Sequence, residues 1–434
     1  MSFQQGLSGL AASSSDLDVI GNNIANANTF GAKSSTAVFA DMYANAISGA
    51  GGSQVGIGAT MATVAQQFTQ GTITSTGNPL DVAINGSGFF ELADKAGTLS
   101  YSRNGQFQLN STGYIVNSGG LQLMGYPANS NGVIQPGAAS PLQLPTAGIA
   151  PQVTSKSSLQ LNLSSGAAIT APTTSPAINF SDATTYNNAT SQSIYDAQGE
   201  AIDMTYYFQH APDTTTGTAP STTTTNTWNV FATANGTTVS GTTAAPTPLA
   251  QVQFDATKGT WVSSSAGNPA TVTTPPSLTN AAGVPIPSFS FKVDLSGMTQ
   301  YGSAFGVTNQ TQDGYAPGQL AGITIGQSGI ITANYSNGQT QAAGQLELAN
   351  FRNPQGLQAQ SGNIWSATAA SGNPIVGVAG QGNLGVLQSG ALEASNVDLT
   401  GQLVGMITAQ RVYQANAQTI KTQDAVMQTL VSLQ

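Results

Sequence analysis

The chain has 434 residues, only 6% of them charged, and its 9 basic and 18 acidic side chains give a formal net charge of −9. Because single hydrophobic cores stop growing at roughly 250 to 300 residues, this length predicts several domains. The scarcity of Lys and Arg argues against binding to nucleic acid or to an anionic membrane surface, and the absence of Cys excludes disulfides and thiolate metal sites.

The first predicted element is a helix of about 25 residues that begins near residue 4. Apolar and small residues recur there at alternating spacings of three and four, the period of one helix face. These positions are Leu7, Leu10, Ser14, Leu17, Gly21, Ile24 and Asn28. Serines and two aspartates interrupt the apolar residues, so we expect no cleaved secretory signal peptide and no membrane insertion.

The long middle section has the sequence pattern of β structure. It contains Asn-Gly dipeptides, which predict hairpins because both central residues of a type I′ turn need positive φ. The dipeptides begin at Asn85, Asn104, Asn131, Asn235 and Asn337. The Thr-rich tract from Thr214 to Thr227 is compatible with two structures, a low-complexity loop and a β-hairpin.

Changes in composition along the chain predict nested domains. We expect the fold to be mainly β with α-helical termini, in which the N- and C-terminal helices pair as a coiled coil. The predicted domains are a terminal helical domain (1–30 plus 396–434), Gly-rich connectors (31–70 plus 363–395), an inner β domain (71–147 plus 290–362) and an inserted outer β domain (148–289).

The last predicted element is a C-terminal helix with the same 3-4 spacing as the first. Its periodic positions are Leu399, Leu403, Met406, Gln410, Tyr413, Ala417, Ile420, Asp424, Met427 and Val431. Few charged side chains are present to solvate this helix, so we expect other subunits to cover it. An intramolecular coiled coil in an ordinary soluble protein is the alternative.

No catalytic or metal-binding constellation is present in the sequence. His210 is the only histidine, and its neighbours offer no nucleophile-elbow pattern. The scattered carboxylates lack the spacing of an EF-hand loop. We therefore expect a non-enzymatic protein with no cofactor and no metal.

Two segments at opposite ends of the chain resemble the bacterial flagellar rod and hook family. The N-terminal segment is LDVIGNNIANANTFGAK (Leu17 to Lys33), and the C-terminal one is SGALEASNVDLTGQLVGMITAQRVYQANAQTI (Ser389 to Ile420). Inner segments from Phe68 to Phe90 and from Tyr101 to Asn117 are similar to the β body of the same family. The resemblance covers roughly the outer 60% of the chain, and two such motifs at opposite ends are specific.

The resemblance implies a structural subunit, and the large outer domain favours a hook member over a rod member. Such a subunit polymerises with itself into a flexible helical tube, a universal joint that transmits torque from rod to filament. The implied partners are the rod and hook-filament junction proteins, the hook cap and the flagellar type III export apparatus. The implied location is extracellular, in the hook and basal body. The alternatives are a distal rod protein and a secreted β-rich adhesin or carbohydrate-binding module.

The predicted assembly residues lie on the two terminal helices. On the N-terminal helix they are Leu7, Leu10, Leu17, Asn22, Asn23, Ile24, Asn26 and Thr29. On the C-terminal helix they are Leu399, Leu403, Met406, Gln410, Arg411, Tyr413, Gln414, Asn416, Ile420 and Met427. The three asparagines are compatible with two roles, cross-linking neighbouring helices and closing their own helix.

Overall fold

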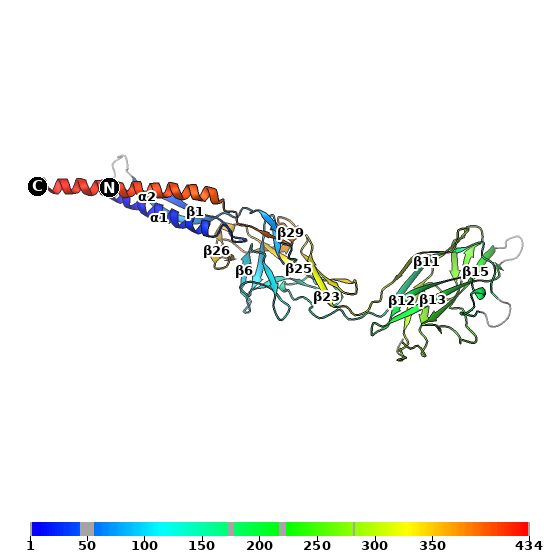
Figure 1. Cartoon of the computed structure of the whole chain (residues 1–434). Helices are drawn as coiled ribbons and strands as arrows, with labels where there is room; N and C mark the ends of the chain where they lie inside the picture. The colour runs from blue at the N-terminus through cyan, green and yellow to red at the C-terminus, as the bar shows by residue number, and fades with distance from the viewer. Residues whose placement is uncertain (1, 44–55, 172–177, 217–222, 281–282, 433–434) are drawn as a thin grey trace. The chain divides into compact units, whose positions relative to one another are not determined.

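The computed structural model describes residues 2–43, 56–171, 178–216, 223–280 and 283–432 (Figure 1). The chain divides into two compact units. The terminal unit comprises Met1–Thr146, Leu320–Asn334 and Thr340–Gln434, and the inserted unit comprises Ala147–Gln319 and Tyr335–Gln339. Among the described helices, none is long and apolar enough to cross a membrane.

The terminal unit contains both α-helices, which pack against each other as the sequence predicts. They are α1 (Ser2–Ala25) and α2 (Leu399–Ser432). An antiparallel hairpin of β1 (Ser35–Tyr43) and β2 (Gly56–Gln66) lies along α1. The predicted connector 31–70 is therefore largely a β-hairpin in the structure. Close approach is possible because Gly58 has φ of +132°, and a Cβ there would overlap the Ser8 side chain.

A twelve-stranded sheet forms the body of the terminal unit, with the main order β23-β24-β25-β9-β5-β6-β27-β26. The strands of this unit after the hairpin are β3 (Ile73–Ser75), β4 (Val82–Asn85), β5 (Phe89–Ala93), β6 (Leu99–Ser102), β7 (Phe107–Leu109), β8 (Ile115–Asn117), β9 (Gln122–Pro127), β10 (Ser140–Pro141), β23 (Leu320–Ile325), β24 (Ile330–Tyr335), β25 (Thr340–Asn350), β26 (Gln358–Gln360), β27 (Ile364–Ser366), β28 (Ile375–Val378), β29 (Val386–Ser389) and β30 (Ala391–Glu393), with a 3-10 turn at Pro354–Gly356.

Both faces of this sheet are covered near β5, whose five residues are all buried. Phe90 and Leu92 belong to the larger apolar cluster, while Phe89 packs with Tyr101 and Trp365 in a smaller one. This arrangement follows from the alternation of side chains along a strand. It also places the intervening Glu91 on the same face as the smaller cluster.

The inserted unit has two sheets that share one apolar core. The five-stranded sheet contains β11 (Lys156–Ser164), β19 (Ala270–Thr273), β20 (Ser290–Asp294), β21 (Thr299–Tyr301) and β22 (Gly306–Gln312). The seven-stranded sheet contains β12 (Asn188–Tyr195), β13 (Ala201–His210), β14 (Thr214–Thr216), β15 (Thr223–Ala234), β16 (Thr237–Thr238), β17 (Ala250–Asp255) and β18 (Trp261–Ser264); a 3-10 turn lies at Ala183–Thr185.

This unit extends past the boundary expected at residue 289, because three later strands pair with β11. β20 and β21 are parallel to it, and β22 is antiparallel. In the Thr-rich tract, β14 pairs antiparallel with the start of β15. The tip at residues 217–222 lies outside the described residues.

The Asn-Gly dipeptides differ in their structural roles. Asn235 and Gly236 have φ of 45° and 77° and join the paired strands β15 and β16, as a type I′ turn requires. Gly105 does not adopt a positive φ. A Cβ on Gly105 would instead overlap the carbonyl oxygen of Val82, so this glycine is needed for close packing of backbone segments.

Candidate assembly surface

The two helices run antiparallel and contact each other through small and polar residues, here termed the helix seam. Gly6 lies against Ile420, and Gly9 lies against the side chain of Asn416. Towards the other end, the Asn23 amide donates a hydrogen bond to Gln402 at 3.1 Å. Glycines in the helix seam let the two backbones approach closely.

The helix seam lies one residue before most of the periodic positions identified in the sequence. Gly6, Ser13, Ile20 and Asn23 are buried on α1, whereas Leu7 is 53% exposed. The reason is steric, because each isoleucine of the helix seam faces a glycine, Ile420 against Gly6 and Ile20 against Gly405, and a second large side chain there would force the helices apart. The leucine periodicity therefore marks the flank of the helix seam and not its centre.

Most of the predicted assembly residues remain accessible in the single chain. Asn23 is buried; Leu10, Leu17, Ile24, Asn26, Thr29, Met406, Asn416 and Ile420 are half-buried; Leu7, Asn22, Leu399, Leu403, Gln410, Arg411, Tyr413, Gln414 and Met427 are exposed. The structure brings Asn416 and Ile420 to α1, but the described residues leave most of the larger apolar side chains of α2 exposed.

The asparagines of α1 divide between the two roles expected of them. Asn23 links elements: it bonds the backbone carbonyl and amide of Ser35 at 2.7 and 2.8 Å and also reaches Gln402. Asn26 instead donates back to the carbonyl of Asn22 at 2.9 Å, within its own helix end. The buried asparagine thus fixes the hairpin and both helices together.

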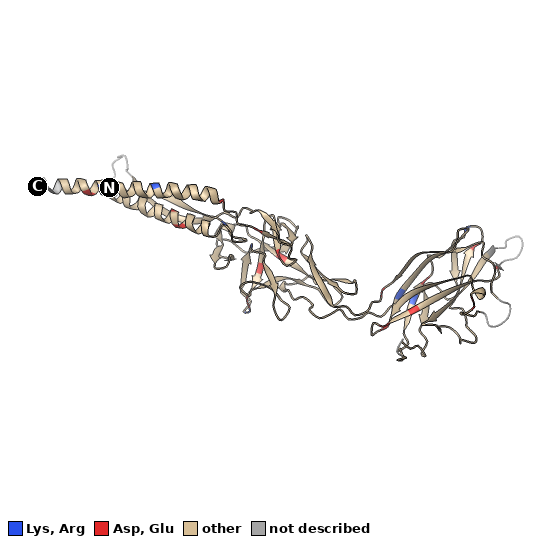
Figure 2. Cartoon of the chain, viewed as in Figure 1, with Lys and Arg blue, Asp and Glu red and all other residues tan. Residues whose placement is uncertain are grey.

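Exposed apolar side chains gather on the helices and the hairpin. Of the twenty-five large apolar side chains that are exposed among the described residues, two lie on α1, five on the β1–β2 hairpin and eight on α2. Figure 2 shows how few charged residues the helices carry. A groove of about 550 Å³ runs between them, lined mainly by small residues and by Phe39, Val404 and Val412, with Asp16 and Asn416 as further polar residues. Contiguous apolar surface of this kind marks a protein interaction site.

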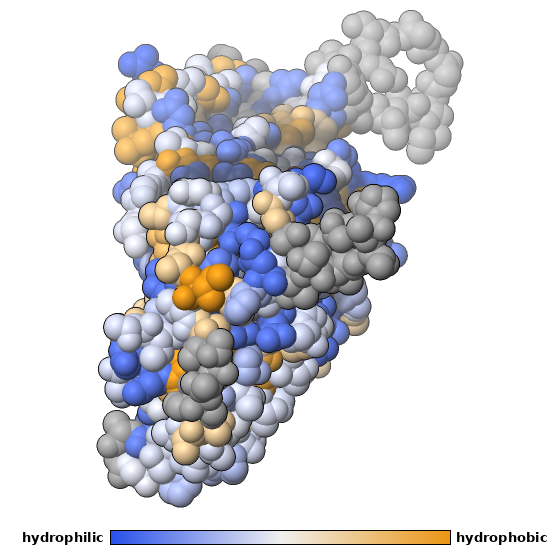
Figure 3. All heavy atoms as spheres, turned by 90° about the vertical axis from the view of Figure 1, so that its right-hand side faces the viewer, coloured by the Kyte–Doolittle hydropathy of each residue, from blue (hydrophilic) through white to orange (hydrophobic). Residues whose placement is uncertain are grey.

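The inserted unit has a different surface. In Figure 3, polar and near-neutral residues predominate on the face shown, and apolar residues appear as separate spots. Scattered apolar residues are normal on a folded domain. Among the described residues, most of the exposed large apolar side chains therefore lie on the terminal helices and the hairpin.

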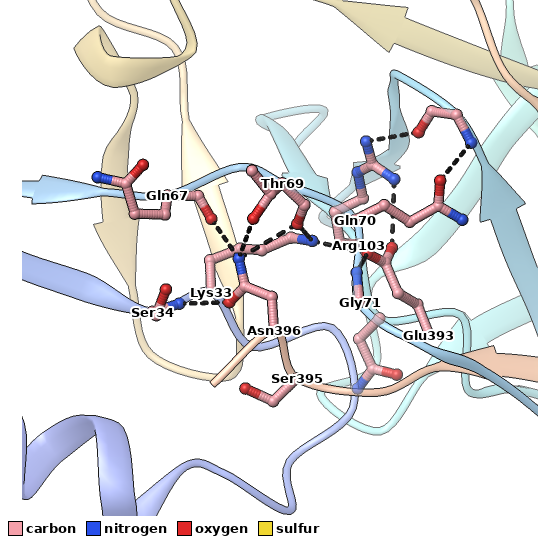
Figure 4. A network of polar contacts seen from close by, with 12 residues as sticks. Lys33, Ser34, Gln67, Thr69, Gln70, Gly71, Arg103, Glu393, Ser395 and Asn396 are labelled. Atoms are coloured by element: carbon pink, nitrogen blue, oxygen red, sulfur yellow. Dashed lines mark hydrogen bonds and ion pairs between the residues drawn. The ribbon is translucent and has the colours of Figure 1, made fainter. Parts of the chain in front are cut away.

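A buried network of ions and amides joins these helices to the β body (Figure 4). The Lys33 ammonium contacts Glu393 at 2.7 Å and donates to the Thr69 carbonyl at 2.8 Å. Arg103 contacts the other oxygen of Glu393 at 3.2 Å, and the Gly71 amide donates to this carboxylate at 2.9 Å. The ionic side chains are almost fully inaccessible, so each charge depends on its partners.

Electrostatics in this network follow from burial. Burial lowers the pKa of Lys33, and the charge and hydrogen bond of Glu393 oppose that shift. The same two opposing effects act on Arg103, whose pKa burial lowers. A single carboxylate therefore compensates two buried cations.

Asn396 completes the connection between the two ends of the chain. Its carbonyl oxygen accepts a hydrogen bond from the Ser34 amide at 2.7 Å, and its amide donates to the carbonyl of Gln67 at 2.7 Å. Lys33 closes the N-terminal motif, whereas Glu393 and Asn396 lie within the C-terminal motif. The two distant motifs therefore meet in space and fix where both helices leave the β body.

Sequence reasoning did not identify Lys33, Arg103, Glu393 or Asn396 as a site. The sequence does contain a hint, because charged residues make up only 6% of the chain and yet Lys33 and Glu393 both lie in the terminal motifs, close to the helices. Local periodicity, however, does not reveal that Lys33 and Glu393 are buried or that they pair across 360 residues of sequence.

Four family models match the chain. They are described as flagella basal body rod protein (residues 3–33), flagellar hook protein FlgE/F/G D1 domain (83–197), flagellar basal body protein FlaE D2 domain (160–315) and flagellar basal body rod FlgEFG protein C-terminal (388–433). The first and last ranges contain α1 and α2, and the others lie in the β units.

Relatives of full length show the same relationship. The chain is 45% identical to the flagellar hook protein FlgE of Escherichia coli K12 and 44% identical to that of Salmonella typhimurium, each over 100% of both chains. Identity to the hook protein of Borreliella burgdorferi is 31%, over 100% of this chain and 99% of the relative. The crystal structure of Helicobacter pylori flagellar hook protein FlgE2 has a similar fold, with a TM-score of 0.54 at 15% identity over 74% of this chain and 100% of that chain.

Proposed function

Since the chain belongs to the family of bacterial flagellar hook proteins, we propose that copies of it assemble through the exposed apolar faces of α1, α2 and the β1–β2 hairpin. The protein is a structural subunit of the flagellar hook, and its family is not an enzyme family. Full-length similarity to hook proteins does not favour the rod and adhesin alternatives.

The observation that carries the proposal is the position of the large apolar side chains. The helix seam uses small residues, so Leu7, Leu403 and Val404 remain 53%, 41% and 60% exposed. Burying a fully exposed side chain of this size contributes roughly 1.5–3 kcal/mol, so burying the exposed half of each of these contributes roughly half as much. A surface with many of them gains enough from self-association to hold a polymer.

The predicted assembly residues are included in this proposal. Leu399, Leu403 and Met406 follow one another along α2, and Tyr413 and Met427 extend the line towards its C-terminus. In the assembled tube these side chains pack against neighbouring copies. Arg411, exposed in the single chain, forms a hydrogen bond or ion pair with a neighbour.

Placing Glu at Leu403 tests this surface. The side chain is exposed, so Leu403→Glu leaves the helix seam intact while adding a charge that assembly would bury. We expect the variant to retain its circular dichroism spectrum but to form no curved tubes in negative-stain electron microscopy, under salt conditions in which the parent chain polymerises.

Val262→Glu is the matched control, because Val262 is 46% exposed on the inserted unit. That variant should still form tubes. Tubes from Leu403→Glu in normal yield would contradict the proposed surface, and straight, stiff tubes from the parent chain would indicate a rod-like role.

The proposal also covers partners and location. The tube connects the rod to the hook-filament junction proteins, grows beneath the hook cap and transmits torque outside the cell. The subunit reaches that site through the flagellar type III export apparatus. Helices that depend on neighbouring subunits for burial suit this route, since they are less stable before assembly than after it.

Export has a direct measurement. In cells whose flagellar export apparatus is inactivated, the chain should accumulate inside, whereas cells with a working apparatus and no hook cap should release it into the medium. Release that is independent of the export apparatus would contradict this route while leaving the assembly surface untouched.

A further inference from the structure

Two glutamates lie next to each other in the sheet of the terminal unit, away from the assembly surface. Phe90 of β5 pairs with Leu348 of β25 in antiparallel register, and Glu91 and Glu347 are the next residues on the two strands, where β9 begins to pair with both. Both residues are buried, with exposed fractions of 4% and 2%. Because side chains alternate along a strand, both carboxyl groups lie on the face opposite to Phe90 and Leu348, where the charge of Glu347 acts on Glu91.

The hydrogen bonds around the two carboxyl groups are unequal. The Tyr126 hydroxyl donates to Glu347 at 2.7 Å. The Oε2 atom of Glu91 is buried and has no hydrogen-bond partner among the described residues. A buried carboxylate oxygen without a donor is strongly unfavourable, so this atom requires a proton or a ligand.

No basic side chain among the described residues bonds the Oε2 atom of Glu91. Glu91 faces Tyr101 on β6, and β28, which pairs with Glu347, contains no ionisable side chain. The guanidinium of Arg103 lies 5.4 Å from the ring centre of Phe89, and its ion pair is with Glu393. Among the described residues, the ionisable groups at this site are thus the two carboxyls themselves and the phenols of Tyr101 and Tyr126.

We propose that Glu91 and Glu347 share one proton and form a proton-binding site inside the β body of the terminal unit. Glu91 carries the proton and donates it to Glu347, which also accepts the Tyr126 hydrogen bond. This arrangement gives the orphaned oxygen its partner and leaves one negative charge where two would repel each other in a poorly solvated site.

The acidities of the four groups agree with this arrangement. Burial, reinforced by the charge of Glu347, raises the pKa of Glu91 from its ordinary 4.5 to about 7. Burial also raises the pKa of Glu347, and the Tyr126 hydrogen bond opposes the rise. Burial and the two glutamates raise the pKa of Tyr101 to about 12, and burial and the hydrogen bond to Glu347 raise the pKa of Tyr126 to about 12, so both phenols remain protonated.

A consequence for stability follows from the sign of the shift. The folded-state pKa of Glu91 lies above its unfolded value, so the folded state binds the proton more tightly. The stability gained from this proton is fully present below the unfolded pKa and is lost as pH rises through about 7. The terminal unit is therefore expected to weaken on the alkaline side.

Carbon-13 NMR can observe the proton directly. The chain has only four glutamates, Glu91, Glu200, Glu347 and Glu393, so selective labelling of the glutamate δ-carbon gives four assignable signals. Each Glu→Gln variant of the full chain identifies the signal that it removes. We expect the Glu91 signal to titrate with a midpoint near 7 and to shift to lower pH in Glu347→Gln, which removes the neighbouring charge but not the burial.

Urea unfolding at a series of pH values provides a second measurement. A pair of glutamates that bound no proton near neutral pH would give no such pH dependence of stability. The stability of the parent terminal unit should fall between about pH 5 and about pH 8, and Glu91→Gln should flatten this dependence. Glu200→Gln, at an exposed glutamate of the inserted unit, should leave it unchanged.

Three results would overturn the proposal. The first is a Glu91 midpoint at its ordinary value, and the second is a midpoint that Glu347→Gln does not move. The third is a change of both carboxyl signals on addition of calcium, with loss of the titration near 7, because the pair would then hold a cation in place of the proton. None of these results bears on self-assembly.

Discussion

Glu393→Gln is expected to destabilise the terminal unit by about 3–5 kcal/mol, the typical loss when one partner of a buried ion pair is removed. The substitution keeps the size of the side chain but leaves Lys33 and Arg103 buried without an anion. It also weakens the acceptor for the Gly71 amide. Urea unfolding followed by far-ultraviolet circular dichroism measures the effect, because the described α-helices both belong to the terminal unit.

Two variants separate the charge effect from a general loss of packing. Lys33→Met in the Glu393→Gln background removes one orphaned cation and should recover part of the lost stability. Asp18→Asn removes an exposed acid from α1 and should change stability by no more than about 0.5 kcal/mol. A Glu393→Gln midpoint equal to that of the parent would show that the network does not hold the helices in place.

Long, regular elements could be predicted from the sequence because their signal repeats many times. The 3-4 spacing from residue 4 to residue 28 corresponds to α1 at Ser2–Ala25, and the spacing from Leu399 corresponds to α2 at Leu399–Ser432. Periodicity identifies a helix but does not say which flank is in contact. Glycines occupy the closest approach here, and hydrophobicity patterns give them no weight.

Pairing between distant segments could not be predicted. Ser290–Asp294 pairs with β19 on one side and with β11 on the other, and β11 is more than a hundred residues earlier in the chain, so composition placed the boundary too soon. The Gly-rich sequence obscured the strand pattern of the β1–β2 hairpin. One of these glycines, Gly58, allows the hairpin to pack closely against α1. In the same way, the site at Lys33 and Glu393 exists only because two ends of the chain meet.

Gly105→Ala is expected to destabilise the terminal unit by about 3 kcal/mol, the upper part of the usual range for overpacking. A Cβ at this position would overlap the Val82 carbonyl oxygen and come within 3.2 Å of the Phe90 ring. The obstructing oxygen belongs to backbone that is itself held by the hydrogen bond from the Val82 amide to the Gly105 carbonyl, at 3.0 Å. Relief therefore requires moving β4 and not merely a side chain.

Gly137→Ala is the matched control for this prediction. It is the same substitution in the same unit, but a Cβ there meets no atom within 4 Å and φ is not positive. Its unfolding midpoint should match that of the parent.

If Gly105→Ala also unfolded like the parent, the close contact with Val82 would be relieved without cost, and β4 would have to be free to shift. Because Val82 is fully buried and pairs with Ser389 of β29, such a shift would also disturb the strand that leads into the C-terminal motif. We therefore expect the loss of stability in Gly105→Ala to be accompanied by weaker tube formation, which Gly137→Ala should not show.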